Sequence, residues 1–213
     1  PYYSDDLVTL HHGDCREVDA WLTADVLVTD PPYGRNYKGH GAGWTNAGGG
    51  GGHRSTGQAV SIPNDTDTNA RDEALALWGD RLAVVFGDLL IEQPPGAVQV
   101  MIYGKPRDAG ILGARAGRRR DVEGIYLCGP WPTGVGGKSS VFTTGALVAG
   151  PRGLSVRNGH PHAKPLDVLE ELIGLAGGTI ADPFAGSGST LIAAKRLGRK
   201  AYGVELEERY CEI

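Results

Sequence analysis

The stretch TIADPFAGSGSTLIAAKRLG, residues 179–198, decides the fold class of this chain. Its first residues, which end at Asp182, are apolar and typical of a buried strand, and the residues from Ser189 onward favour a helix that Gly198 closes. The turn between them carries Gly186 and Gly188, where the absence of side chains lets a ligand approach the backbone. A strand, a glycine turn and a helix in this order predict an α/β unit with a ligand at the helix N-terminus.

Strands and helices alternate on both sides of this unit. Residues 200–206 (KAYGVEL) favour a strand, and residues 165–176 (PLDVLEELIGLA) favour an amphipathic helix. Towards the N-terminus, the same patterns predict helices at 15–22 and 67–78 and strands at 7–14, 24–30, 81–88, 97–105 and 121–129. This alternation predicts a single α/β domain over residues 1–213, with a mostly parallel, twisted sheet and helices on both faces.

Composition and charge exclude several classes of protein. With 213 residues, 40% of them hydrophobic and 22% charged, the chain suits a soluble globular domain, and no apolar run is long enough to span a membrane. The three cysteines form no CxxC pair and no signal peptide opens the chain, so we expect a cytoplasmic protein without membrane partners. The net charge of −4 argues against a protein that coats DNA, although local clusters of positive charge still allow contact with it. Because the sequence starts at Pro1 and stops within a helical-looking stretch, we expect a fragment of a longer chain.

A second informative stretch is Asp30-Pro31-Pro32-Tyr33, which ends a predicted buried strand. Open α/β sheets bind their ligands at the carboxyl ends of such strands. The prolines fix the backbone, and the Asp30 carboxylate and the Pro31 carbonyl can accept both N–H groups of a base amine. Tyr33 can stack on the face of a base turned out of the double helix. A plain turn that ends a strand is the alternative interpretation.

The chemistry of amine methylation suits these groups. The lone pair of a base amine is conjugated to the ring, so the nitrogen is a poor nucleophile. Two acceptors favour a pyramidal nitrogen and tolerate its growing positive charge. A sulfonium methyl group is already activated, so in-line alignment is the remaining task, and the extra proton leaves through Asp30 or to water.

The glycine turn near the C-terminus does not match the common nucleotide-binding motifs. The GxGxxG fingerprint of NAD sites needs a third glycine where Leu191 stands, and a Walker A loop needs a lysine that this turn lacks. The helix N-terminus suits a carboxylate or a phosphate, and Glu205, at the end of the next predicted strand, can accept hydrogen bonds from ribose hydroxyls. A simple strand–helix turn is again the alternative.

Taken together, the two stretches resemble the signature of the DNA amino-methyltransferases, which make N6-methyladenine or N4-methylcytosine. The DPPY tetrapeptide is Asp30–Tyr33, and the FxGxG loop is Phe184–Gly188. DPPY comes first, which resembles the circularly permuted, β-type motif order of the family. Gly13-Asp14 and the run HPHAKP at 160–165 match two further family elements, so the resemblance covers residues 8–34 and 160–212.

This resemblance implies a Rossmann-like, S-adenosylmethionine-dependent methyltransferase fold that methylates the exocyclic amine of a flipped base. It implies that Asp30, Pro31, Pro32 and Tyr33 are catalytic. In the family, the aspartate after the first strand meets the cofactor's adenine, HPxxKP lies near its methionine end, and the acid that Glu205 matches binds the ribose. The residues implied for the S-adenosyl-L-methionine site are Asp14, His160, Lys164, Pro165, Asp182, Pro183, Phe184, Gly186, Ser187, Gly188, Thr190 and Glu205.

The middle of the chain departs from the family pattern. Residues 34–59 are rich in glycine and predict a mobile loop. Most members carry a substantial target-recognition region, whereas only residues 105–159 are available here, so we expect modest sequence specificity. A solvated helix face is one interpretation of the arginines in this insert. The arginines that we expect to contact DNA phosphates instead are Arg115, Arg118, Arg119 and Arg120.

The expected target is adenine N6, because cytosine-N4 relatives more often carry serine where Asp30 stands. Cytosine N4 is the alternative within the family, and RNA or protein amides are weaker candidates because those relatives usually show asparagine there. A non-catalytic S-adenosylmethionine- or DNA-binding module is an alternative of another class, although the intact Asp30 and Tyr33 argue against it. The implied partner is double-stranded DNA, with a restriction endonuclease or with none (an orphan or phage enzyme), and the protein is a monomer or a homodimer.

Two further possibilities involve residues close to Cys15. His11, His12 and Cys15 would lie at a strand end and a turn with no second cluster of ligands nearby, so we expect no metal. Cytosine-C5 methylation uses a nucleophilic cysteine within a Pro-Cys element, which Cys15 lacks.

Overall fold

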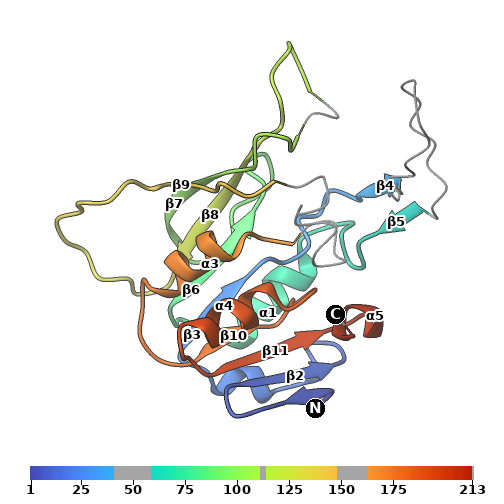
Figure 1. Cartoon of the computed structure of the whole chain (residues 1–213), viewed down its shortest axis with the longest axis vertical. Coiled ribbons are helices and arrows are strands. Elements are labelled where there is room, and N and C mark those ends of the chain that lie inside the picture. Colours follow the sequence, from blue (N-terminus) through green and yellow to red (C-terminus); the bar gives the residue numbers. More distant parts are fainter. Residues whose placement is uncertain (41–58, 111–113, 148–162, 213) are drawn as a thin grey trace.

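The computed structural model describes residues 1–40, 59–110, 114–147 and 163–212. Within these parts, a nine-stranded sheet forms the centre of the molecule, and β4 (Lys38–His40) and β5 (Ala59–Ser61) form a separate pair (Figure 1). The strands of the large sheet lie in the order β1 (Tyr3–Ser4), β2 (Val8–His12), β11 (Ala201–Glu205), β10 (Ile180–Asp182), β3 (Val26–Thr29), β6 (Ala83–Gly87), β8 (Val122–Cys128), β7 (Ala97–Gly104) and β9 (Val141–Thr143).

Most neighbouring strands of the large sheet are parallel. The central strands β2, β11, β10, β3 and β6 all run in one direction. By contrast, β8 is antiparallel to both β6 and β7, and β1 is antiparallel to β2. The predicted α/β fold with a mostly parallel sheet is therefore confirmed, with β8 reversed inside the sheet and β1 reversed at its edge.

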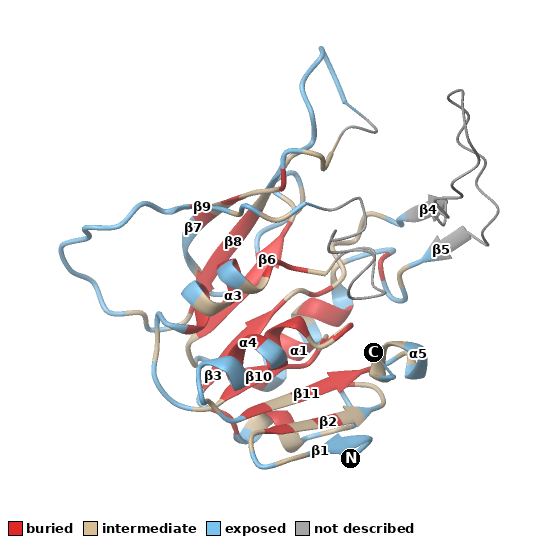
Figure 2. Ribbon diagram, viewed as in Figure 1, coloured by how far each residue is buried: buried red, intermediate tan, exposed pale blue. Residues whose placement is uncertain are grey.

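Helices cover both faces of this sheet, and the residues of β3 show why. Val26 and Val28 pack with α3 and α4 on one face, whereas Leu27, which points the other way, packs with α1 and η1. Because both faces are covered, β10, β3 and β6 are buried throughout (Figure 2). The helices are η1 (Ala20–Thr23, a 3₁₀ helix), α1 (Asn69–Trp78), α3 (Leu166–Ile173), α4 (Ser189–Arg196) and α5 (Glu208–Cys211).

The chain leaves β3 and β10 in opposite directions. From β3 it continues to β6 on one side, and from β10 it continues to β11 on the other side. Adjacent parallel strands whose connections diverge leave a crevice outside their carboxyl ends, where α/β proteins bind ligands. The DPPY residues follow β3 and the glycine turn follows β10, so the topology brings both motifs to this crevice.

Two local predictions were wrong in extent. Residues 15–22 form no α-helix, because only Ala20–Thr23 is helical, and that element is η1. Trp21 is fully buried there and donates a hydrogen bond from Nε1 to the Cys15 carbonyl at 2.9 Å, which holds the turn against the core. The segment 34–59, where a mobile loop is expected, is not irregular throughout, because it includes β4 and the first residue of β5, which pair with each other. Its residues 41–58 lie outside the described residues.

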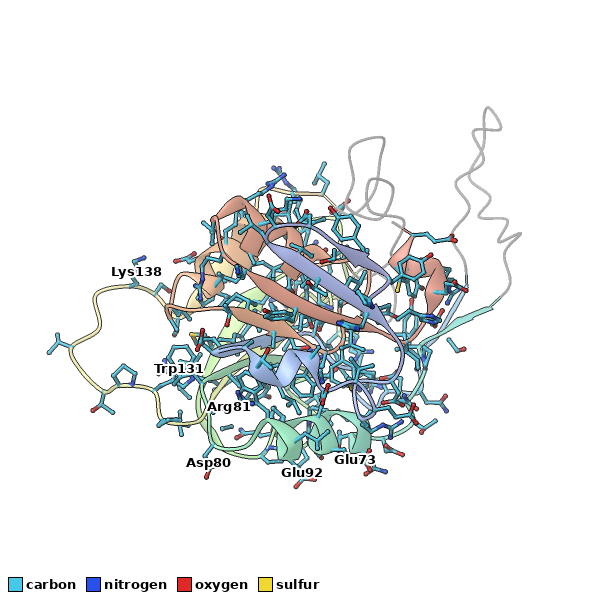
Figure 3. All side chains as sticks on the ribbon, turned by 90° about the horizontal axis from the view of Figure 1, so that it is seen from below. Glu73, Asp80, Arg81, Glu92, Trp131 and Lys138 are labelled. Carbon is cyan, nitrogen blue, oxygen red and sulfur yellow. The ribbon has the colours of Figure 1, made fainter. Side chains whose placement is uncertain are left out.

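The edge of the sheet opposite the crevice is closed by Arg81 and Trp131, both labelled in Figure 3. Arg81 stacks on Trp78 and donates to the carbonyls of Leu22 and Ala24, and Trp131 Nε1 donates to the Cys128 carbonyl at 2.9 Å. A hollow of about 570 Å³ lies beside Trp78 and Arg81, where β6 begins, and is therefore remote from the DPPY residues. No helix in the described parts of the chain has the length and apolar character to cross a membrane.

Candidate active site

Acidic residues gather along one edge of the sheet. Because the five central strands are parallel, the residues at their carboxyl ends meet at the same edge (Figure 1). An acid lies at or just after each of these ends. In the order of the strands β2, β11, β10, β3 and β6, these acids are Asp14, Glu205, Asp182, Asp30 and Asp88.

Asp30 is held by two donors, one on each carboxylate oxygen. The Tyr33 hydroxyl donates to its Oδ1 at 2.7 Å, and Lys164 Nζ donates to its Oδ2 at 2.6 Å. Asp30 remains partly exposed, with a quarter of its side chain (25%) accessible, whereas Lys164 is buried. Pro31 is also buried, and its carbonyl accepts no hydrogen bond from the described parts of the chain. The carboxylate and this carbonyl are therefore available as two acceptors for an incoming amine.

Glu123 and Lys105 complete this cluster, and no sequence pattern indicated a role for Glu123. Glu123 Oε2 accepts from Lys164 Nζ and from the Tyr33 hydroxyl, both at 3.2 Å, and its Oε1 lies 2.6 Å from Lys105 Nζ. Glu123 starts the reversed strand β8, so it reaches the edge at which the parallel strands end. We define Asp30, Tyr33, Lys105, Glu123 and Lys164 as the DPPY cluster.

Opposite charges keep Glu123 and Lys164 in their charged forms. Burial alone would raise the pKa of Glu123, but Lys164 and Lys105 together lower it below its ordinary value. Burial alone would lower the pKa of Lys164, but Asp30 and Glu123 raise it. Burial raises the pKa of Tyr33 well above its usual value, and the neighbouring Asp30 and Glu123 add to this effect, so the hydroxyl stays a donor. The two carboxylates and two ammonium groups make the cluster neutral overall.

Asp182 connects the DPPY strand to the glycine turn. Its Oδ1 accepts from the hydroxyl of Thr29, at the end of β3, at 2.7 Å, and from the backbone N–H of Phe184, in the turn, at 3.2 Å. The hydroxyl of Thr190, in the first turn of α4, also donates to this carboxylate. Burial raises the pKa of Asp182 to about 6 despite these donors. Asp182 is therefore buried between the two motifs, and its hydrogen bonds fix their relative position.

The raised pKa of Asp182 predicts a pH-dependent contribution to stability. The pKa of Asp182 is about 6 in the folded protein and near its ordinary value in the unfolded chain, so the carboxyl binds its proton more tightly in the folded protein. Its contribution to the free energy of unfolding is therefore lost as the pH rises through about 6. Asp182→Asn removes the titration. We expect the free energy of unfolding of the variant, minus that of the wild type, to rise by about 2 kcal/mol between pH 4 and pH 7. Urea titrations at both pH values test this, and a constant difference would refute it.

The turn after β10 presents donors and open space at the N-terminus of α4. Gly186 and Gly188 have φ values of 52° and 76°, which favour glycine, and a Cβ at Gly188 would meet no atom within 4 Å. The Oγ of Ser189 is buried and has no hydrogen-bond partner in the described parts of the chain. A polar atom left unpaired beside open space and free helix N–H groups fits a bound polar or anionic ligand.

Glu205 lies beside this turn, and its geometry suits a ligand with hydroxyl groups. Its Oε2 accepts from the Gly186 N–H at 2.7 Å and its Oε1 accepts from the Glu207 N–H at 2.8 Å. A carboxylate has about four acceptor positions, so two remain for a ligand. Burial raises the pKa of Glu205, and the backbone donors at Glu207 and Gly186 oppose that rise. The free acceptor positions of Glu205 therefore fit the hydroxyl groups of a nucleoside that carries a ribose.

Other residues predicted for the cofactor site lie along the same edge. Asp14 is partly exposed and accepts from the Arg16 guanidinium, with 2.8 Å between Arg16 Nε and Oδ1. Lys164 faces Asp30, so in this structure it belongs to the DPPY cluster. His160 lies outside the described residues. The remaining predicted residues are buried or partly buried around the turn and the start of α3, and they are Pro165, Pro183, Phe184, Ser187 and Thr190.

Asp65 anchors the residues that follow DPPY, and sequence reasoning missed it. This buried side chain accepts backbone N–H groups from Gly34 at 2.8 Å and Tyr37 at 2.8 Å, and from Arg35 at 3.3 Å. Arg35 also pairs with Asp88, with 2.7 Å between Nε and Oδ2. The segment 34–37 is therefore fixed by side chains that lie far away in the sequence.

The arginines of the insert that the structure describes do not lie on a helix, so the interpretation of this cluster as a solvated helix face is wrong. Arg115 and Arg118 pair with each other across an antiparallel β-bridge, and all four predicted DNA-contacting arginines are exposed. Arg119 pairs with Asp121, with 2.8 Å between Nη2 and Oδ2, and Arg120 Nη2 lies 3.8 Å from Asp88. The contact with Asp88 places this arginine bridge next to the acidic edge of the sheet. Residues 111–113 and 148–159 of the insert lie outside the described residues.

Comparison with known sequences points to one family. Residues 129–213 match the family model described as DNA methylase. Type II methyltransferase M2.DpnII of Streptococcus pneumoniae is 46% identical over 57 residues, which cover 25% of this chain and 21% of that protein. Type II methyltransferase M.ScaI of Streptomyces caespitosus is 26% identical over 100% of this chain and 82% of its own length. The chain thus spans about a fifth of M2.DpnII (21%) but most of M.ScaI.

Comparison with solved structures identifies the fold. The M1.HpyAVI–SAM complex matches with a TM-score of 0.62 and 17% identity, over 97% of this chain and 96% of that chain. PvuII DNA methyltransferase, which is cytosine-N4-specific, matches with a TM-score of 0.61 and 14% identity, over 99% of this chain and 86% of that chain. The chain therefore has the Rossmann-like fold of these methyltransferases, as the sequence predicted.

Proposed function

Because this chain is a relative of the DNA amino-methyltransferases, we propose that it transfers a methyl group from S-adenosyl-L-methionine to the exocyclic amine of a DNA base. The observation that carries this proposal is the position of Asp30. This partly exposed carboxylate stands at the crevice beside the turn that Glu205 and Asp182 support. A methyl donor in that turn and an amine at Asp30 would be neighbours.

The residues of the chain align the amine and accept its charge. The Asp30 carboxylate and the Pro31 carbonyl accept the two amine N–H groups, which favours a pyramidal nitrogen. The Tyr33 hydroxyl donates to Asp30 at 2.7 Å and has Glu123 as a second acceptor at 3.2 Å, which fixes the ring of Tyr33 so that it can stack on the flipped base. The extra proton of the methylated nitrogen passes to Asp30 or to water.

The glycine turn would hold the cofactor. When bound, S-adenosyl-L-methionine supplies a sulfonium methyl group, so that the amine nitrogen bonds to this carbon while the carbon–sulfur bond breaks and sulfur keeps the electron pair. Glu205 accepts hydrogen bonds from the ribose hydroxyls, and the turn at Gly186–Gly188 lets the ligand approach the backbone. The free N–H groups at the start of α4 and the Ser189 hydroxyl donate to polar atoms of the ligand.

We propose adenine N6 as the target, because the acceptor at the first position of the tetrapeptide is the carboxylate of Asp30. Cytosine N4 is the second candidate, and the similarity to the fold of a cytosine-N4-specific enzyme supports it. A Type II restriction endonuclease is a proposed partner, because the two relatives named above are Type II methyltransferases.

One experiment tests the reaction and the target together. The protein is incubated with methyl-labelled S-adenosyl-L-methionine and mixed-sequence double-stranded DNA, and the digested nucleosides are identified by mass spectrometry. Labelled N6-methyladenine supports the proposal, and labelled N4-methylcytosine supports the second candidate. Binding of the cofactor with no label in DNA would identify a non-catalytic binding module instead.

The exposed arginines of the insert are proposed to contact DNA phosphates. Replacing Arg118, Arg119 and Arg120 together with alanine should weaken binding to all DNA sequences and reduce the slope of log K against log salt by up to about three, roughly one for each phosphate contact. Fluorescence anisotropy with labelled duplexes at several salt concentrations measures this slope. An unchanged slope would rule out the phosphate contacts.

A further inference from the structure

Asp30 enters the proposed reaction with both carboxylate oxygens already engaged. Tyr33 donates to Oδ1 at 2.7 Å and Lys164 donates to Oδ2 at 2.6 Å. A target amine must share these oxygens or replace a donor. The buried Lys164 ammonium cannot simply lose its partner, because an unpaired buried charge is strongly unfavourable. Where the amine replaces one of these donors, that donor therefore needs a second acceptor.

Glu123 is placed to act as this second acceptor. Its Oε2 lies 3.2 Å from Lys164 Nζ and 3.2 Å from the Tyr33 hydroxyl, so one oxygen atom is within reach of both donors of Asp30. These distances are longer than those to Asp30, which leaves room for both contacts to shorten. The other oxygen of Glu123 is held by Lys105 at 2.6 Å, so the acceptor itself is fixed in place.

We propose that Glu123 is a positioning residue for the transfer, which takes over the hydrogen bonds of Lys164 and Tyr33 when Asp30 turns to the target amine. This inference rests on the proposed function. Glu123 does not touch the substrate. It frees the Asp30 carboxylate while Lys164 stays paired and the Tyr33 ring stays in place.

Charge gives Glu123 a second effect on the same step. The amine nitrogen gains positive charge as the methyl group arrives, and the ammonium of Lys164, 2.6 Å from Asp30, would oppose that gain. The Glu123 carboxylate offsets the charge of Lys164. Without it, the DPPY cluster would carry a net positive charge where a cation has to form.

Glu123→Gln tests the inference because it keeps the shape of the side chain and removes its charge. We expect kcat to fall on the order of 10- to 100-fold, while the Kd for S-adenosyl-L-methionine, measured by calorimetry without DNA, stays within about threefold. Glu92→Gln, at an exposed position labelled in Figure 3, is the matched control and should keep the wild-type kcat. A kcat unchanged in Glu123→Gln, in an active wild-type background, would overturn the inference. No transfer by the wild type would instead overturn the proposed function.

Lys105→Met provides a second test that does not need the Glu123 variant to fold. The titratable groups around Glu123 come from three parts of the chain. They are Tyr103 on β7 and Lys105 directly after it, Lys164 before α3, and Asp30 and Tyr33 after β3. Lys105 is one of two lysines that lower the pKa of Glu123, so its loss raises that pKa. We expect the loss of kcat on acidification to begin at a higher pH in this variant than in the wild type. A profile that superimposes on that of the wild type would overturn the role of the Glu123 charge.

Discussion

Asp30→Asn is expected to lower kcat for methyl transfer by a factor on the order of 10³, the loss seen when one acceptor or donor for transition-state charge is removed. The substitution keeps the size of the side chain but removes the charge that faces the amine as its nitrogen becomes cationic. Lys164 retains Glu123 as a partner, so the DPPY cluster should stay folded. The rate is measured as the transfer of labelled methyl groups to DNA at saturating cofactor.

The affinity for the cofactor separates this effect from general damage to the site. Glu205, at the end of β11, and the glycine turn after β10 share no hydrogen bond with Asp30 in the described parts of the chain, so the Kd for S-adenosyl-L-methionine should change little. Asp80→Asn, at an exposed position labelled in Figure 3, removes the same charge at the opposite edge of the sheet and should leave the rate unchanged. Wild-type activity in Asp30→Asn would refute the role assigned to this carboxylate.

Glu205→Gln should produce the reverse pattern, with a large loss of cofactor affinity. The variant keeps one acceptor oxygen but replaces the other with an NH₂ group, which meets the N–H of Gly186 or of Glu207. The turn then loses a charged hydrogen bond and the ribose loses an acceptor. A hydrogen bond to a charged group contributes about 1.5–3 kcal/mol, so Kd should rise by roughly 10- to 100-fold.

Calorimetric titration with S-adenosyl-L-methionine measures this change directly. Glu208→Gln, at an exposed position on α5, is the control for the loss of one negative charge near the same strand. At saturating cofactor, Glu205→Gln should recover most of the transfer rate, which Asp30→Asn should not. An unchanged Kd in Glu205→Gln would mean that the ribose is held elsewhere.

The two motifs that carry the proposed function could be predicted from the sequence because their signals are local. Asp30 and Asp182 each end an apolar run typical of a buried strand, and a proline follows each acid. Carboxyl ends of parallel strands share one edge, so the α/β alternation explains why Asp30, Asp182 and Glu205 lie along the same edge. The structure places them at or just after the ends of three adjacent strands, β3, β10 and β11.

Residues that act through long-range contacts could not be predicted in this way. Asp65 lies in a turn that resembles any surface turn, yet it accepts three backbone N–H groups from a segment about 30 residues earlier, as the separation of 31 between Gly34 and Asp65 shows. Nothing near Asp65 in the sequence indicates this contact, because it depends on how the chain returns after β5.

The DPPY tetrapeptide shows where the contribution of the sequence ends. The sequence by itself determined the α/β fold, the position of Asp30 at a strand end, and the glycine turn that faces it, because strand periodicity, proline and glycine act within a few residues. Only the tertiary structure decided which groups surround Asp30. The reversed direction of β8 brings Glu123 to the edge where the parallel strands end, and Lys164 arrives there 134 residues after Asp30. Strand direction and such distant contacts follow from the packing of the whole sheet, which no local pattern encodes.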